Sequence, residues 1–219
     1  MNLVDIVHKL WNNDGRDRPW GYVMPVMIVG AGNLDGEDGD AVNVPQFTIV
    51  GETHLGEVGG RTVVASASFT RPADTTAYTA KDTVSNSTSV PTVLTFSNLA
   101  RIAGGSGYIT KARLLTNQST NTARFRLHLY HTAPTAINDN SPFTLLWANR
   151  AIRVGYIDFD AATTEGTGSD SASALNSVIR LAFSCTSASR TLYGALETID
   201  AFTPASAQEF FIELSAELN

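Results

Sequence analysis

The sequence offers almost no material for covalent cross-linking, because it contains a single cysteine, Cys185, among 219 residues. One cysteine cannot form an internal disulfide, which excludes a fold held together by disulfide bonds. A nucleophilic cysteine would need a histidine partner, and no pattern in the sequence supplies one. Because Cys185 lies within an apolar strand-like segment, we predict that it is a small core residue.

Charged side chains are also scarce, at 16% of the residues, whereas about a quarter is usual in soluble domains. The net charge is −6, and Lys and Arg form no cluster of the kind that binds phosphates. The composition therefore argues against a nucleic-acid partner. Ser and Thr occupy many polar positions, which suits a protein that works inside an assembly or against sugars.

Long apolar runs are missing as well. The longest apolar stretch, residues 23–31, is interrupted by Pro25 and is too short to span a bilayer. At the N-terminus, Asp5 and His8 interrupt the apolar pattern, and no basic segment precedes a continuous apolar one as in a signal peptide. We therefore expect no membrane partner, and we expect the chain to be made and assembled in a cytoplasm.

What the sequence does contain, from about residue 61 to 219, is a series of short β-patterned segments. In the clearest of them, 123–130, Phe125, Leu127 and Leu129 fall on one face. The opposite face carries Arg124, Arg126, His128 and Tyr130. A period of two predicts a half-buried antiparallel strand with one solvated face. We interpret that face as solvated surface; the alternative is that Arg124 and Arg126 meet an acidic partner subunit.

The segments together predict an all-β domain. Clusters of Gly, Asn, Ser and Pro separate them, as turns require, and loops of mixed length favour an antiparallel β-sandwich of the jelly-roll type. The domain is expected to occupy residues 61–219. The expected strands are 62–70, 90–96, 108–116, 123–130, 144–147, 152–159, 178–184, 191–197 and 209–216.

Residues 1–60 have a different character. Apolar residues recur there at the spacing of one helical face: Leu3, Ile6, Val7, Leu10 and Trp11. The pattern predicts a short amphipathic helix, which must dock on its own domain or on another chain because so short a helix is not stable alone. An extended arm rich in Gly and Pro follows up to residue 60, and we expect it to become ordered against a partner.

No segment carries a recognisable catalytic or metal-binding pattern. The acidic segment 33–40 lacks the spacing of a calcium loop, so an acidic turn is the better interpretation. The histidines do not have zinc-ligand spacing. Asp158 and Asp160 lie side by side on one strand, whereas glycosidase carboxyls face each other across a cleft. We predict a protein that is not an enzyme and needs no cofactor or metal.

One stretch is distinctive as a string of residues: Phe69-Thr-Arg-Pro-Ala-Asp-Thr-Thr-Ala-Tyr78. Together with Asn86-Ser-Thr88, Pro91-Thr-Val-Leu-Thr-Phe96 and Phe202-Thr-Pro-Ala-Ser206, it resembles a group of tailed-bacteriophage and prophage virion proteins. The resemblance covers about residues 56–218 and does not extend clearly to the first sixty. It implies a non-enzymatic structural part of the virion.

Within that class, we interpret the chain as a capsid decoration (cement) protein that binds and stabilises the major capsid protein shell. Helix and arm would attach it, so the expected partner-binding residues are Leu3, Ile6, Val7, Leu10, Trp11, Arg124 and Arg126. We expect a homotrimer, because threefold positions are natural gaps of an icosahedral shell and cyclic closure covers edge strands.

Two alternatives remain open. The first is a tail or fibre component with a glycan-binding β-sandwich, in which the aromatic platforms would be Tyr108, Tyr130, Trp147 and Tyr156. The simpler interpretation of these aromatic residues is that they fill the core or a subunit interface. The second alternative is a tail-associated hydrolase of host polysaccharide, which the missing pair of carboxylates disfavours.

Overall fold

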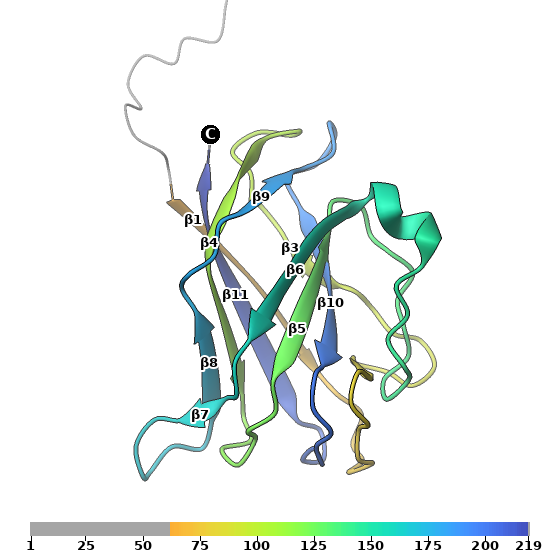
Figure 1. Ribbon diagram of the computed structural model, residues 1–219, viewed down its shortest axis with the longest axis vertical. Coiled ribbons are helices and arrows are strands. Elements are labelled where there is room, and N and C mark those ends of the chain that lie inside the picture. The colour runs from red at the N-terminus through yellow and green to blue at the C-terminus, as the bar shows by residue number, and fades with distance from the viewer. Residues whose placement is uncertain (1–61, 219) are drawn as a thin grey trace, which may run out of the picture. The chain divides into compact units, whose positions relative to one another are not determined.

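A computed structural model describes residues 62–218 of the chain, and these form two antiparallel β-sheets with almost no helix (Figure 1). The strands of the first sheet, sheet I, are β1 (Thr62–Thr70), β4 (Ser106–Thr116), β7 (Thr163–Thr164), β8 (Ala172–Asn176), β9 (Leu181–Ser184) and β11 (Glu209–Leu218). The strands of sheet II are β2 (Thr83–Val84), β3 (Leu94–Phe96), β5 (Phe125–Tyr130), β6 (Arg153–Phe159) and β10 (Leu192–Thr198). The all-β prediction is confirmed, whereas the predicted helix and arm lie outside the described residues.

The strand order of each sheet brings distant parts of the chain together. Sheet I has the order β1-β11-β4-β8-β7, with β9 also paired to β4. Sheet II has the order β2-β10-β5-β6, with β3 also paired to β10. In Figure 1, β5, β6 and β10 lie in front of β1, β4 and β11, so the two sheets form two layers.

The core lies between these layers, and the long strands β4 and β11 turn every second residue toward it. Phe125 and Leu127 of sheet II and Leu114 and Ile212 of sheet I have no exposed surface, and all four belong to one core cluster. Burying one such side chain is worth about 1.5–3 kcal/mol. Cys185 is also buried in this cluster, as predicted.

The predicted strand at 144–147 is wrong. Residues 144–146 lie in a loop, and a 3₁₀ helix, η1 (Trp147–Ala151), follows. The apolar run there does not pair into a sheet; its loop packs onto the outer face of sheet II, where Phe143 stacks on His128 with ring centroids 4.0 Å apart.

The outer face of β5 is also less solvated than predicted. His128 and Tyr130 are buried, whereas Arg124 and Arg126 remain partly exposed. The loop that carries Phe143 covers one end of this face. The sequence pattern therefore predicted correctly which residues of β5 face outward, but only some of those residues are solvated.

Gly107 gives a direct test of how closely β4 and β11 approach. A Cβ atom at this position would overlap the carbonyl oxygen of Glu217 and would lie 3.2 Å from side-chain atoms of Leu218 and Phe183. We expect Gly107→Ala to lower the free energy of unfolding by about 1–3 kcal/mol, because the backbone must shift. Gly168→Ala is the matched control, since nothing lies within 4 Å of a Cβ there. Equal urea midpoints for the two variants would contradict the described approach.

Candidate partner-binding surface

The loop that joins β5 to β6, residues 131–152, presents the most exposed aromatic side chain among the described residues. We call it the covering loop. Trp147 is 79% exposed, and its neighbours Leu145 and Leu146 are 49% and 43% exposed. The helical turn η1 that begins at Trp147 stands out at the side of the domain, at the upper right of Figure 1. Exposed apolar side chains next to one another mark a candidate contact surface.

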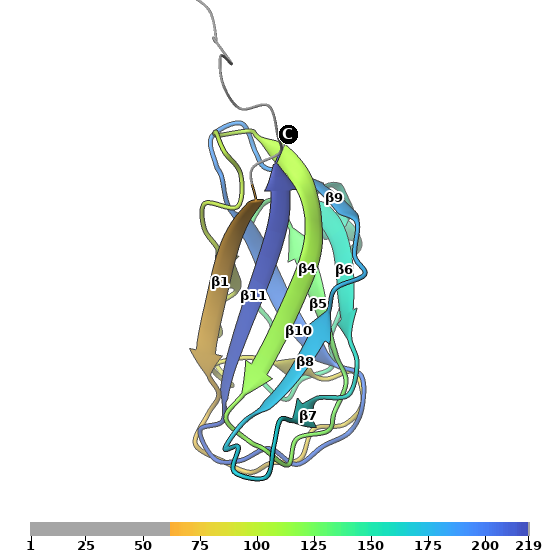
Figure 2. The ribbon, with the colours of Figure 1, turned by 90° about the vertical axis from the view of Figure 1, so that its left-hand side faces the viewer.

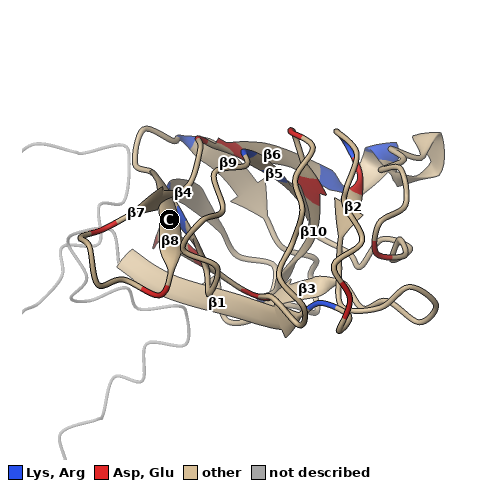
Figure 3. Cartoon of the chain, turned by 90° about the horizontal axis from the view of Figure 1, so that it is seen from below, with Lys and Arg blue, Asp and Glu red and all other residues tan. Residues whose placement is uncertain are grey.

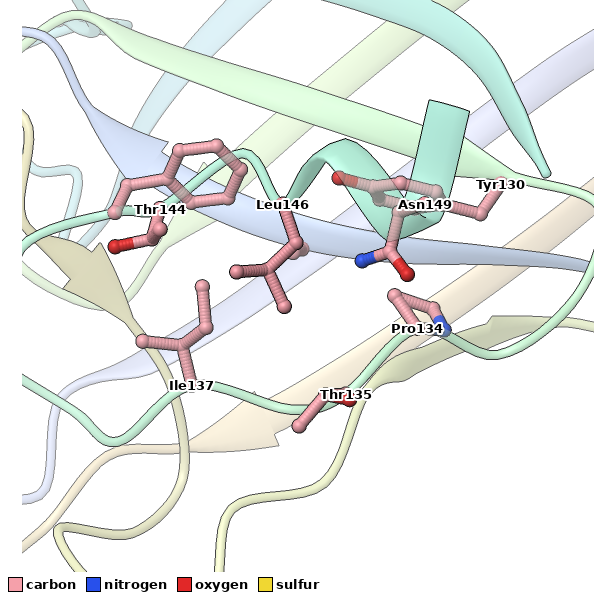
Figure 4. A pocket seen from close by; sticks show the side chains of 9 residues that line it. Tyr130, Pro134, Thr135, Ile137, Thr144, Leu146 and Asn149 are labelled. Atoms are coloured by element: carbon pink, nitrogen blue, oxygen red, sulfur yellow. The ribbon is translucent and has the colours of Figure 1, made fainter. Parts of the chain in front are cut away.

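A small hollow lies beneath this part of the loop. Its volume is about 70 Å³, which corresponds to roughly two water molecules or the end of one aliphatic side chain. In Figure 4, Leu146, Ile137 and Pro134 point toward a common space. Tyr130 and Ala195 of sheet II also line it. The hollow and the exposed apolar residues together suit a partner that inserts a small aliphatic side chain.

A buried polar network fixes the covering loop to the rest of the domain. Asp139 of the loop accepts a hydrogen bond from the Tyr78 hydroxyl at 2.6 Å and forms an ion pair with Arg71 at 3.2 Å. The Arg71 Nε atom donates to the same Tyr78 oxygen at 2.9 Å. The side chains of Arg71 and Asp139 are both fully buried. Arg71 and Tyr78 belong to the distinctive 69–78 stretch, so that stretch has a structural role here.

Further hydrogen bonds complete this network. The backbone N–H of Ser85 donates to Asp139 at 2.8 Å, and the backbone N–H of Asp139 donates to the carbonyl of Ser87 at 2.8 Å. Burial, together with the hydrogen bond to Asp139, raises the pKa of Tyr78 well above its ordinary value of 10. The phenol therefore stays protonated and continues to donate. The loop is held in one position, which lowers the entropy cost of presenting Trp147 to a partner.

Beside the loop, the outer face of sheet II carries paired charges (Figure 3). Arg126 forms two hydrogen bonds with Asp158, at 2.6 and 3.0 Å, and its guanidinium lies 4.3 Å from the ring centre of Tyr156. Arg124 pairs with Asp200 at 2.7 Å. Both arginines that we predicted to meet a partner therefore already have an acidic partner within the chain.

A buried pair lies between these charges and the loop. His128 Nε2 lies 2.7 Å from a carboxylate oxygen of Glu197, and the imidazole ring is stacked on Phe143. Burial lowers the pKa of His128 below its ordinary value of 6.5, while Glu197 acts in the opposite direction. The neutral imidazole is thus the form that the folded domain favours.

This shift makes stability depend on pH. Because the folded state has the lower pKa, the unfolded state binds the proton first, and stability falls as the pH drops through about 6.5. We expect His128→Gln to reduce the difference in unfolding free energy between about pH 7.5 and about pH 5.5. Asp200→Asn should leave that difference unchanged, since the Asp200 pKa is lowered from 3.8. An undiminished difference in His128→Gln, measured by urea unfolding, would show that another group titrates.

The predicted attachment residues Leu3, Ile6, Val7, Leu10 and Trp11 lie outside the described residues. Between residues 62 and 218, no group of three His, Cys, Asp or Glu side chains could hold a metal ion. In the same part of the chain, no helix is long and apolar enough to cross a membrane.

Sequence reasoning named Trp147 as an aromatic platform and missed Asp139. The exposure of Trp147 depends on the covering loop, which we had predicted to be partly a strand. Tyr130, a second expected platform, is buried, whereas Tyr156 is 49% exposed. No local pattern around Asp139 indicates its role, since its partners Arg71 and Tyr78 are 68 and 61 residues away.

No family model matches the chain, and no curated protein matches its sequence. Among solved structures, it is similar to one chain of the "Cyanophage Pam1 capsid asymmetric unit", with a TM-score of 0.34 and 16% sequence identity. The match covers 82% of this chain and 99% of that chain. A TM-score this low gives no argument about what the present chain does.

Proposed function

We propose that this protein is a non-enzymatic structural component of a bacteriophage particle, and that it decorates the capsid by binding the major capsid protein. The observation that carries the proposal is the covering loop. It holds Leu145, Leu146 and Trp147 exposed beside a hollow, and the buried Arg71–Asp139 ion pair anchors it. A rigidly held tryptophan among aliphatic side chains is typical of the energetic centre of a protein interface.

The choice of partner rests on the sequence. The 69–78 stretch resembles virion proteins of tailed phages, and the proposal places the protein in the virion after assembly in the host cytoplasm. Residues 1–60 would form the attachment helix and arm, with contacts from Leu3, Ile6, Val7, Leu10 and Trp11. Several weak contacts on one chain combine into strong attachment when all can be made at once.

The strand orders support a jelly-roll interpretation of the fold. In sheet II, and in sheet I from β1 to β8, strands from the two halves of the chain alternate, as they do when a long hairpin is wrapped into two sheets. Jelly rolls occur in viral capsid and lectin domains. Since one fold serves many functions, this is support by analogy for a capsid role.

Heating of particles with and without this protein tests the proposal. Binding to the assembled shell and not to its dissociated subunits stabilises the shell by mass action. Particles that lack the protein should therefore assemble but release DNA at a lower temperature, and adding the purified protein should restore the release temperature. Equal release curves combined with lost adsorption to cells would instead indicate a tail component.

A glycan-binding tail or fibre protein is the second candidate, and the exposure of Trp147 favours it. Sugar rings stack on exposed aromatic faces, and one face of Trp147 lies next to Arg150, whose guanidinium is 4.9 Å from the ring centre. Tyr156 is less suitable because two arginines, Arg126 and Arg153, lie near its ring and its side chain is less exposed than that of Trp147. Binding to a glycan array that Trp147→Ala abolishes would support this candidate.

A further inference from the structure

Strand β1 forms one margin of sheet I. Among the described residues its hydrogen-bonded neighbour is β11, in an unbroken antiparallel register from Thr62 opposite Glu217 to Thr70 opposite Glu209. No described strand pairs with its other edge, and β1 forms the left margin of the sheet in Figure 2. An edge of nine residues presents a row of backbone N–H and C=O groups that can pair with another strand.

The other edge strands of the two sheets have features that hinder pairing with another chain, and β1 lacks them. Strands β7 and β2 have two residues each, and β6 carries the charged residues Arg153 and Asp158, with a register shift in β5 next to the residue opposite Arg153. Strand β1, with the sequence TVVASASFT, contains no charge and no proline, and it is uncharged along its whole length in Figure 3. An edge strand of this kind is typical of one that another strand covers in the assembled protein.

Burial along β1 is also incomplete. Its inward-facing residues Val63, Ala67 and Phe69 pack against the core and are only partly buried. On the outward face, Val64 is 59% exposed. One further strand beside β1 would complete the burial of the inward-facing apolar side chains.

The sequence of β1 is nearly symmetric about Ser66, which favours a second copy of β1 as that strand. In an antiparallel pair centred on Ser66, Thr62 lies opposite Thr70, Val63 opposite Phe69, Val64 opposite Ser68, and Ala65 opposite Ala67. Because each outward residue then meets an outward residue, both sheets keep their apolar faces on the core side. The pairing sets aromatic residues against β-branched ones, which is favourable, and brings no like charges together.

We propose that two copies of this chain associate through β1, paired antiparallel and centred on Ser66. The two sheets I then continue into each other across a twofold axis. The contact differs from the homotrimer that the sequence led us to expect, and it does not depend on where in the particle the protein acts.

Disulfide trapping in the full-length chain tests the pairing and its register. Ser66→Cys places two thiols on directly opposite residues, whose Cα atoms lie about 4.5–5.5 Å apart, within the range that a disulfide spans. Val64→Cys is the matched control, because its two copies are offset by about 13 Å along the strands. The native Cys185 is buried and leaves the probe thiol as the reactive one.

Under mild oxidation at micromolar concentration, Ser66→Cys should run on a non-reducing gel at twice the chain mass of 23.4 kDa. Val64→Cys alone should stay monomeric, and a mixture of Val64→Cys with Ser68→Cys should cross-link. Equal cross-linking of Ser66→Cys and Val64→Cys, or none in Ser66→Cys, would overturn the proposal.

Charge substitution at the same position gives a second, independent readout. Ser66 is exposed and lies opposite Glu213 of β11, so Ser66→Lys should keep the melting temperature of the fold, while Ser66→Asp should fold with a slightly lower one because two acidic residues then lie opposite each other. Each variant alone should sediment as a monomer because like charges meet at the axis, and an equimolar mixture should restore the dimer. A wild-type chain that sediments as a monomer or a trimer, or a Ser66→Lys variant that remains dimeric, contradicts pairing through β1.

Discussion

Replacing Asp139 by alanine is expected to lower the free energy of unfolding by about 3–5 kcal/mol, the usual cost of breaking a buried ion pair from one side. The variant removes the carboxylate that accepts from Tyr78 and from the backbone of Ser85, and it leaves the buried Arg71 guanidinium without its fully buried counter-charge. Domains of this size are stable by about 5–15 kcal/mol. Urea unfolding monitored by far-UV circular dichroism should show the loss.

Two further variants test whether the loss of stability comes from the burial of the ion pair or from the removal of any carboxylate. Asp200→Ala removes the partner of Arg124 at an exposed position, and we expect it to cost less than about 1 kcal/mol. The double variant Arg71→Met with Asp139→Ala should be more stable than Asp139→Ala alone, because no unpaired charge remains buried. If Asp139→Ala cost no more than Asp200→Ala, the network would not be what holds the covering loop.

If the protein decorates capsids as proposed, replacing Trp147 by alanine is expected to weaken its binding to capsids that lack this protein by about thirtyfold or more. This is the effect of losing an interface residue worth at least about 2 kcal/mol. Trp147 is 79% exposed and does not belong to the core cluster, so the melting temperature of the domain should not change. Co-sedimentation of the variant with capsids across a concentration series measures the change in affinity.

Val178→Ala is the matched control for this experiment. Val178 is 94% exposed on the connection between β8 and β9, away from the covering loop. Its truncation should leave the affinity for capsids unchanged. Equal occupancy of capsids by the Trp147 variant and the wild type would remove the covering loop from the attachment surface and leave residues 1–60 as the remaining candidate.

Much of the fold could be predicted because its strands carry strong local patterns. The bounds of β1 were predicted correctly, and β4, β5, β6, β10 and β11 were found within a few residues. Strand β8, Ala172–Asn176, was missed because Ala, Ser and Asn have little intrinsic preference for strands. It is a strand because β4 offers it a partner along Ala112–Thr116.

The candidate site was harder to predict, because it depends on contacts between residues far apart in the sequence. Arg71 and Tyr78 were singled out as part of a distinctive string, and their common partner Asp139 lies in another loop. The apolar residues 145–147 were recognised as apolar but were assigned to a strand. Whether such a run pairs within a sheet or covers one depends on the strands around it. The residues of the run alone do not distinguish the two.

The order of strands in sheet I also determines when the domain can fold during translation. Strand β11 lies between β1 and β4 in the sheet and follows both in the sequence, so β1 lacks its described partner until β11 has left the ribosome. At about 5–20 residues per second, that wait lasts on the order of ten seconds. During it, the uncharged β1 strand is available to other nascent chains on both of its edges. Chaperones that bind extended apolar segments therefore have their best opportunity at β1 before β11 emerges.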